Sequence, residues 1–289
     1  MSTPEQSVAV VTGHRGFIGQ HAARALGADG WLVVTAGRPD LEIPSPAFSS
    51  LLRDSAPVLV VHCAGPSSVQ TAEDAPEADR AGSVGVVEAL VTRLEELEHT
   101  PRLLLVSSAA VYGDPPSLPV SVDAPIRPIS AYGRHRVDAE RKALSSDVPT
   151  TVARIFSAYG EGLERQVWWD VAQQALTGDV TLSGDGSESR DFVHGDDIGR
   201  ALATIARRAT FAGDVFNVAT GTETTIAELA DRLVHRINRA ADVTFTGAAR
   251  KGDPRRWRAD IGALRSLGFE PAVGLSEGVE RFARWVREP

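Results

Sequence analysis

Short apolar runs alternate with longer amphipathic segments along the first half of the chain. Runs of about 4–8 apolar residues are typical of strands that are covered on both faces. The runs are Val8–Gly13, Trp31–Gly37, Val58–Gly65, Leu103–Ala109 and Thr150–Phe156. The segments with helical spacing between them are Phe17–Leu26, Ala47–Asp54, Glu77–Glu98 and Tyr132–Leu144. This alternation predicts an α/β protein with a parallel, doubly wound sheet of the Rossmann type.

The pattern becomes less regular after residue 156. Several amphipathic segments follow, among them TIAELADRLVHRI and LSEGVERFARWVRE, with only short runs that suit strands. We therefore expect residues 1–156 to form a dinucleotide-binding Rossmann domain, to which a segment near 190–222 returns. Residues 157–289 are expected to form mainly a smaller C-terminal α/β substrate-binding domain.

Composition and charge narrow the class of protein. The 289 residues are 43% hydrophobic, enough for a sizeable core, and their net charge of −8 does not favour binding to a nucleic-acid backbone. The single cysteine, Cys63, cannot form an internal disulfide, which fits a reducing cytoplasm. The first residues lack the pattern of a signal peptide, and no apolar run approaches the roughly 18 residues of a membrane span. We expect a cytoplasmic protein with no nucleic-acid or membrane partner, and the scattered histidines indicate no metal site.

A glycine-rich loop follows the first apolar run. In VVTGHRGFIG, Gly13, Gly16 and Gly19 are spaced Gly-x-x-Gly-x-x-Gly, directly between a strand and an amphipathic helix. Glycines there permit a tight turn, close approach of a pyrophosphate and close packing of the helix, whose N-terminus attracts phosphate. An ordinary turn is the alternative, but the flanking strand and helix favour a dinucleotide site.

The end of the second strand bears on which dinucleotide binds. NAD sites usually carry Asp or Glu there, which binds the ribose 2′-OH. Here VVTAGRPD places Ala36, Gly37 and Arg38 at the tip, and Arg15 lies in the glycine loop. Two guanidinium groups suit the 2′-phosphate of NADP, which they can bind bidentately. We therefore expect NADP, with NAD as the alternative; the other interpretation is that both arginines are ordinary surface residues.

The order of motifs resembles a known family. VTGHRGFIG, VSSAAVYG and SAYGRHRVDAER are followed by GDGSESRDFVHGDDIGRAL, FNVATGTETTIAELA and RKGDPRRWRADIGALRSLGFEPAVGLSEGV. Together they resemble the extended short-chain dehydrogenases/reductases of the NAD-dependent epimerase/dehydratase family, over nearly the whole chain. The resemblance implies a Rossmann domain, a small C-terminal nucleotide-sugar domain and a nucleoside-diphosphate sugar as substrate. It also implies a homodimer packed through helices beside the active site.

The resemblance places catalysis on Ser108, Tyr132 and Arg136. Tyr132 and Arg136 occupy the family's Tyr-x-x-x-Lys spacing, with arginine in place of the lysine. A free phenol is too weak a base near neutral pH, so a neighbouring cation must stabilise the phenolate. Arginine supplies that charge, but its planar guanidinium differs in shape from an ammonium group. In the family, the lysine also binds the nicotinamide ribose, so we expect the substitution to affect this contact more than the charge. Ser108 stands where the family's Ser/Thr hydrogen-bonds the reacting oxygen; its alternative role is to cap the strand end.

Ala109 and Ala110 bear on the type of reaction. By resemblance, 4,6-dehydratases carry an acidic pair at these positions, and epimerase-reductases carry a cysteine at the second. Alanine transfers no proton, so dehydration and 3,5-epimerisation are disfavoured. We expect NADPH-dependent reduction of a 4-keto (deoxy) nucleotide sugar to the 4-hydroxy sugar. The alternatives are a nucleotide-sugar 4-epimerase that holds NAD tightly and a catalytically impaired NAD(P)-binding regulatory protein.

The remaining site residues follow from the same resemblance. The cofactor-binding set is Gly13, Arg15, Gly16, Phe17, Ile18, Gly19, Arg38, Cys63, Ala64, Gly65, Tyr132 and Arg136. The substrate-binding set is Ser108, Ser157, Arg190, Arg250, Asp253 and Trp257. Two of these have alternative roles: Arg190 could pair with Asp196 or Asp197, and Trp257 could pack in a C-terminal core.

Overall fold

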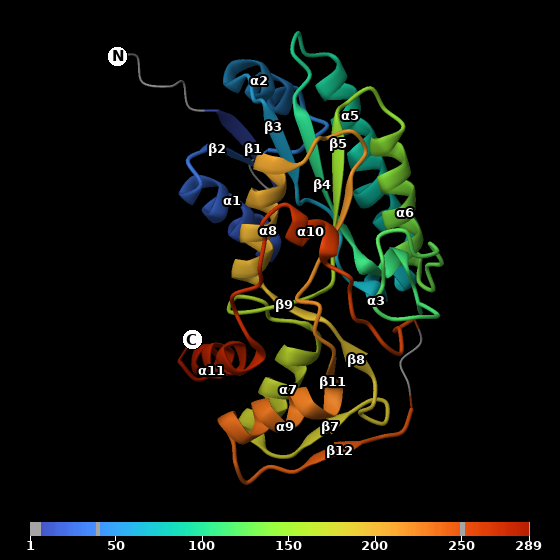
Figure 1. Cartoon of the computed structure of the whole chain (residues 1–289), viewed down its shortest axis with the longest axis vertical. Coiled ribbons are helices and arrows are strands. Elements are labelled where there is room, and N and C mark those ends of the chain that lie inside the picture. The colour runs from blue at the N-terminus through green and yellow to red at the C-terminus, as the bar shows by residue number, and fades with distance from the viewer. Residues whose placement is uncertain (1–6, 39–40, 249–251, 289) are drawn as a thin grey trace.

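A six-stranded parallel sheet forms the centre of the larger part of the molecule (Figure 1). The structure is a computed structural model that describes residues 7–38, 41–248 and 252–288. The strands are β1 (Val8–Thr12), β2 (Leu32–Ala36), β3 (Leu59–His62), β4 (Arg102–Ser108), β5 (Thr150–Ile155) and β10 (Val215–Val218). Their spatial order is β10-β5-β4-β3-β1-β2, and every neighbouring pair is parallel. The predicted Rossmann-type sheet is confirmed, and its strand order reverses direction at β1, where such sheets bind ligands at the carboxyl ends of the strands.

Helices cover both faces of this sheet (Figure 1). One face carries α1 (Phe17–Ala28), α8 (Gly195–Arg208) and α10 (Gly262–Ser266), and the other carries α2 (Pro46–Ser55), α5 (Val86–Glu95) and α6 (Ala131–Leu144). Leu26 of α1 and Ile198 of α8 are fully buried against the sheet. A Cβ atom on Gly199 would lie only 2.5 Å from the backbone oxygen of His21, so glycine lets α8 approach α1 closely.

The helix expected over residues 77–98 forms over residues 76–95 and contains a π-helical turn. The chain forms α3 (Val69–Asp74), α4 (Pro76–Arg80) and a π-helical turn at Ala81–Gly85 before α5 begins. The sequence of this turn, AGSVG, contains two glycines, which are poor helix formers. Single π-helical turns are often found near functional sites. The expected helix is therefore confirmed, with helical backbone angles through the π-helical turn and an end at Glu95.

A second hydrophobic core lies below the sheet in Figure 1. It is built on α7 (Gln166–Thr177), α9 (Ile226–Ile237) and α11 (Leu275–Arg287). Three short pairs of strands accompany it: β6 (Ser157–Tyr159) with β9 (Phe192–His194), β7 (Val180–Leu182) with β12 (Val243–Phe245), and β8 (Ser189–Arg190) with β11 (Thr224–Thr225). The chain enters this core after β5 and returns to the sheet through α8 and β10. A domain boundary at residue 156 stays a prediction.

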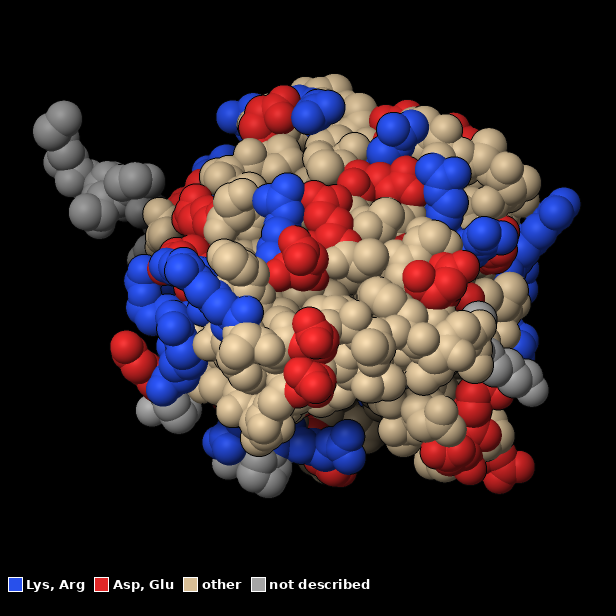
Figure 2. Space-filling model, turned by 90° about the horizontal axis from the view of Figure 1, so that it is seen from below, with Lys and Arg blue, Asp and Glu red and all other residues tan. Residues whose placement is uncertain are grey.

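Charges are mixed on the end of the molecule formed by the second core. Figure 2 shows basic and acidic side chains interspersed over this end, with uncharged surface between them. Among the described residues, no helix has both the length and the apolar character needed to cross a membrane.

Candidate active site

The loop after β1 is shaped by glycines. Gly13 has φ +68°, and a Cβ atom there would lie 2.6 Å from the backbone nitrogen of Ala64. A Cβ atom on Gly19 would lie 2.2 Å from the backbone oxygen of Gly13. Gly16 caps α1 without a side chain, and Phe17 and Ile18 begin its first turn. The unpaired N–H groups of this turn can therefore face a pyrophosphate, so the loop fits a bound dinucleotide.

The end of β2 meets this loop. The carbonyl oxygen of Ala36 accepts hydrogen bonds from the backbone nitrogen of Gly13, at 2.9 Å, and from Nδ1 of His14, at 3.2 Å. Arg15 and Arg38 are both exposed. Sequence reasoning had not singled out His14, although its place between two glycines of the loop was visible.

The residues that follow β3 pack against Gly13. Ala64 contacts Gly13, and Cys63 and Gly65 flank it in the chain. Burial raises the pKa of the Cys63 thiol to about 12, so this cysteine stays protonated and unreactive. Burial, and secondly the charge of Arg136, lower the pKa of His62 to about 3, so its ring is neutral. Nδ1 of His62 lies 2.8 Å from the hydroxyl of Thr12.

Tyr132 and Arg136 lie together on the first turns of α6. The guanidinium carbon of Arg136 lies 5.0 Å from the centroid of the Tyr132 ring. Ser108 ends β4, and its hydroxyl oxygen accepts a hydrogen bond from the backbone nitrogen of Ala110 at 3.2 Å. A Cβ atom on Gly133 would lie 2.6 Å from the carbonyl oxygen of Ala110, so α6 packs directly on the segment that follows Ser108. The predicted catalytic residues therefore come from two elements in direct contact.

Arg136 also contacts the loop after β3. Its side chain is only 7% exposed, and its Nη2 donates to the carbonyl oxygen of Pro66. A Cβ atom on Gly65 would lie 3.2 Å from the same Nη2. The Nε atom of Arg136 is buried without a hydrogen-bond partner among the described protein atoms. The cation is thus fixed between Tyr132 and the loop after β3.

A buried polar network joins α6 to β4 and β5. Glu140 binds Arg154 of β5 with 2.7 Å between Oε2 and Nη2, and both side chains are at most 7% exposed. Ser107 donates to Glu140 at 2.5 Å, and Arg154 donates to the hydroxyl of Tyr112 at 2.8 Å. The Tyr112 hydroxyl then donates to Asn217 at 2.7 Å. Sequence reasoning missed this network, but an arginine inside the apolar run TTVARIF was a signal, because buried charges require partners.

A second buried pair holds α6 against α4. Nδ1 of His135 lies 2.6 Å from Oδ2 of Asp79, and both side chains are almost completely buried. The other carboxylate oxygen of Asp79 has no hydrogen-bond partner within the part of the chain that is described. The residues lie 56 positions apart, so no local pattern could have paired them.

Three predicted substrate-binding residues come together on the side of the second core. Nη2 of Arg190 lies 3.6 Å from Oδ2 of Asp253, and its guanidinium carbon lies 5.7 Å from the Trp257 ring centroid. Trp257 is buried, and its indole nitrogen donates to the carbonyl oxygen of Gly113 at 2.9 Å. Burial lowers the pKa of Arg190 despite its acidic neighbours. Ser157 is half-buried at the start of β6.

Arg250 lies outside the described residues, so the structure does not place it.

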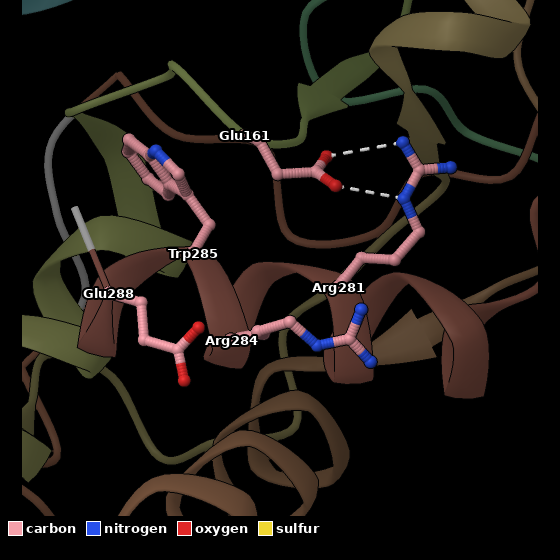
Figure 3. A pocket seen from close by; sticks show the side chains of 5 residues that line it. All are labelled: Glu161, Arg281, Arg284, Trp285 and Glu288. Atoms are coloured by element: carbon pink, nitrogen blue, oxygen red, sulfur yellow. Dashed lines mark hydrogen bonds and ion pairs between the residues drawn. The ribbon is translucent and has the colours of Figure 1, made fainter.

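Ion pairs join the second core to the helices of the sheet. In Figure 3, Glu161 points toward Arg281 of α11, with 2.8 Å between Oε1 and Nε. Arg281 also binds Asp196 of α8 at 2.7 Å, and Nε2 of His194 lies 2.8 Å from Glu161. Burial alone would raise the pKa of Glu161, but hydrogen bonds from His194 and Arg281 lower it to about 2.

Ion pairs border the pocket in Figure 3: Glu161 binds Arg281, and Nη2 of Arg284 lies 3.6 Å from Oε1 of Glu280. Its lining is Glu161, Arg281, Arg284, Trp285 and Glu288. We interpret it as part of the junction between the two cores.

Fold and site together define an enzyme with a Rossmann-type dinucleotide site and a tyrosine–cation pair, the arrangement of an extended short-chain dehydrogenase/reductase. Residues 9–219 match the NAD dependent epimerase/dehydratase family, and the chain belongs to this family. It is thus an enzyme of the NAD-dependent epimerase/dehydratase type.

Similar proteins come from both sequences and solved structures. The UDP-glucose 4-epimerase of Mycolicibacterium smegmatis is 30% identical over 316 residues, covering 96% of this chain and 98% of the relative. MoeE5, solved in complex with UDP-glucuronic acid and NAD, is 27% identical with a TM-score of 0.88, over 97% of this chain and 99% of that one. RMD from Pseudomonas aeruginosa, solved with NADPH, has a TM-score of 0.87 at 23% identity over 98% of this chain and 100% of that one. This last likeness supports the fold alone.

Proposed function

We propose that the protein inverts the C4 hydroxyl of a nucleoside-diphosphate sugar. The observation that carries the proposal is the position of Arg136, which lies 5.0 Å from the Tyr132 ring and also contacts the loop after β3. That loop contacts the glycine loop through Ala64, and α6 contacts the segment after Ser108. A proton-transfer group, its cation and the dinucleotide cradle are therefore linked by direct contacts.

The dinucleotide, when bound, supplies a hydride acceptor and donor. Tyr132 would take the proton of the sugar hydroxyl as hydride leaves C4, and would return it when hydride comes back to the opposite face. Ser108 would hydrogen-bond the oxygen while it is a carbonyl. The positive charge of Arg136, whose guanidinium carbon lies 5.0 Å from the Tyr132 ring centroid, would favour negative charge on the tyrosine during proton transfer.

The substrate side supports a diphosphate. The Arg190 side chain is only 12% exposed, and its carboxylate partner Asp253 is exposed and 3.6 Å away. A second anion would therefore stabilise this cation further. The relatives support the reaction, since a full-length relative is a UDP-glucose 4-epimerase and MoeE5 was solved with a nucleotide sugar and NAD. Ala109 and Ala110 offer no group for elimination of water.

A second candidate is 4-keto reduction with NADPH. Two exposed arginines favour it: Arg38 follows the end of β2, where a carboxylate would select NAD, and Arg15 lies in the glycine loop. This reaction uses the same proton transfer, but Tyr132 donates only and the hydride is not returned. The two reactions therefore differ in their demand for coenzyme, not in their catalytic residues.

One assay separates the two candidates. The purified protein is given UDP-glucose without added coenzyme, and, separately, a 4-keto-6-deoxy nucleotide sugar with NADPH. In the first reaction, we expect the protein to form the 4-epimer of UDP-glucose over many turnovers. Stoichiometric NADPH oxidation in the second, with no epimer in the first, would overturn the epimerase in favour of the reductase.

Variants test the tyrosine–cation pair itself. Tyr132→Phe should lower turnover about 10²- to 10⁴-fold. Arg136→Met should lower it about 10- to 100-fold, because the positive charge beside Tyr132 is lost. Arg136→Lys keeps the charge and should retain activity, as should the control Arg134→Lys on the exposed face of α6. Absence of turnover in the parent as well as in the variants would favour the impaired, cofactor-binding regulatory protein.

We also expect a homodimer in the cytoplasm. Light scattering during gel filtration measures the mass in solution, and a monomeric mass would refute the homodimer.

A further inference from the structure

Two carboxylates hold the turn of α6 that carries Tyr132. Oε1 of Glu73, on α3, accepts a hydrogen bond from the backbone nitrogen of Ala131 at 2.6 Å. Oδ2 of Asp79, on α4, lies 2.6 Å from Nδ1 of His135. Ala131 directly precedes Tyr132 in the chain, and His135 lies three residues after it. The turn is therefore held on both sides of the tyrosine.

The segment that supplies these carboxylates also packs against the loop after β3. In the π-helical turn that continues α4, a Cβ atom on Gly82 would lie 3.0 Å from the side chain of Pro66. A Cβ atom on Gly65 would lie 3.4 Å from the carbonyl oxygen of Gly82. The carbonyl oxygen of Pro66 in turn accepts a hydrogen bond from Arg136. A closed cycle of contacts therefore runs from α6 to α4, through the π-helical turn to this loop, and back to α6.

His135 and Arg136 are the two residues of α6 in this contact cycle. Adjacent residues of a helix point about 100° apart around its axis. His135 contacts α4, and Arg136 contacts the loop after β3. A rotation of the turn that relieved one contact would therefore strain the other. The contact cycle thus fixes the orientation of the turn, and with it the 5.0 Å between the Arg136 guanidinium carbon and the Tyr132 ring centroid.

The pair of Asp79 and His135 is costly as a purely structural contact. Both side chains are at most 11% exposed, and Oδ1 of Asp79 is buried without a hydrogen-bond partner among the described residues. A buried carboxylate with an unpaired oxygen loses hydration that its remaining contact does not fully replace. Apolar side chains of similar size would often stabilise such a position more. They could not supply a directional bond between α4 and α6 beside Arg136.

We propose that Glu73 and Asp79 are positioning residues for the tyrosine–cation pair. Asp79 acts through His135 and sets the place of Arg136, and Glu73 acts through the backbone of the first residue of α6. The inference rests on the proposed function, because the pair that is positioned is the one assigned to proton transfer at C4.

Steady-state kinetics separates positioning from stability. Asp79→Ala removes the acceptor of His135 and should lower kcat about 10- to 100-fold, as a displacement of catalytic groups by about 1 Å does. The KM for UDP-glucose should change less than about threefold, because ground-state binding is not what is lost. Asp79→Asn keeps an oxygen that can accept from Nδ1, and should recover kcat to within about threefold of the parent.

Leu202→Ala is the matched control for stability. Leu202 is fully buried on α8, which covers the opposite face of the sheet from α6. Its truncation leaves a cavity and lowers the unfolding free energy without touching the contact cycle. This variant should keep the kcat of the parent.

Hydrogen exchange on the protein without substrate or coenzyme tests the contact cycle itself. Under conditions where all variants stay folded, Asp79→Ala should exchange about tenfold faster than the parent at residues 131–136 and 65–68, as expected for loss of a charge-assisted hydrogen bond. Leu202→Ala should match the parent in both segments. Glu73→Ala, at an exposed residue, provides a second variant should Asp79→Ala not fold, and it should exchange faster at residues 131–136.

Two results would overturn the proposal. One is unchanged exchange in both segments in Asp79→Ala and in Glu73→Ala, whatever reaction the protein catalyses. The other is an equal loss of kcat in Asp79→Ala and Leu202→Ala, because lowered stability would then explain both. Absence of turnover in the parent would refute the proposed reaction instead, and the exchange measurements would still decide whether the carboxylates hold the turn.

Discussion

Replacing Gly19 by alanine tests whether the packing of α1 on the glycine loop creates the dinucleotide site. The new Cβ would lie 2.2 Å from the Gly13 oxygen, 2.7 Å from the Gly13 carbonyl carbon and 2.9 Å from the Cα of His14. All three are backbone atoms, so no side-chain rotation relieves the overlap, and ordinary contact requires a shift of about 1 Å. Overpacking of this kind typically costs about 1–3 kcal/mol, and the helix propensity of alanine returns about 1 kcal/mol.

Gly27 provides a matched control in the same helix. A Cβ atom there would have no neighbour within 4 Å among the atoms compared, so Gly27→Ala gains only helix propensity, about 0.5–1 kcal/mol of unfolding free energy. We expect Gly19→Ala to weaken NAD or NADPH binding at least about tenfold, since displacement of the loop removes one or more hydrogen bonds to phosphate. Urea denaturation and calorimetric titration measure the two effects. If Gly19→Ala matched Gly27→Ala in both stability and coenzyme affinity, the role assigned to this packing would be wrong.

Three further predictions concern groups around the site. Glu140→Gln leaves Arg154 buried without a counter-charge and should lower the unfolding free energy by about 3–5 kcal/mol. The control Glu96→Gln, at an exposed ion pair, should change the unfolding free energy by at most about 1 kcal/mol. Similar urea midpoints for the two variants would contradict this prediction. Because the pKa of Glu161 is lowered from 4.5 to about 2 in the folded protein, its stabilising effect is complete above pH 4.5 and is lost as pH falls toward 2. The parent should therefore lose more stability over that interval than Glu161→Gln, and parallel curves would refute the assignment. Cys63, with its pKa raised to about 12, should react with thiol reagents near pH 8 only after unfolding; rapid labelling of the native protein would show that the thiol is accessible and ionised.

The fold was predictable because its signals are local. Apolar runs of strand length and amphipathic helical segments can be recognised from residues that are close together in the sequence. The π-helical turn at Ala81–Gly85 within the expected helix was harder to foresee, because helix propensity there competes with packing against a distant loop. There a Cβ on Gly82 would lie 3.0 Å from the side chain of Pro66, so the turn is shaped by a contact that the local pattern does not show.

The candidate site also contains a part that local sequence predicts and a part that it does not. The Tyr-x-x-x-Arg spacing places both side chains on one helix face, and the ring and guanidinium do lie together. The contacts that fix them join residues far apart in sequence: Arg136 with Pro66, His135 with Asp79, and Glu140 with Arg154. Spacing alone cannot supply such pairs, although a charged residue in a buried segment indicates that a partner exists.

The arginine at position 136 has a second consequence beyond its charge. A guanidinium presents several donors in a rigid plane, so one side chain can lie over the Tyr132 ring and still donate to the carbonyl oxygen of Pro66. A lysine has a single ammonium group, and at this position it would have to divide its hydrogen bonds between the loop and a bound ribose. Arg136 therefore ties the loop after β3 to α6 before any coenzyme is bound. Arg136→Lys separates the two roles, because it preserves the charge beside Tyr132 and weakens the tie. Faster hydrogen exchange in the loop after β3, with turnover retained, is the expected result for this variant.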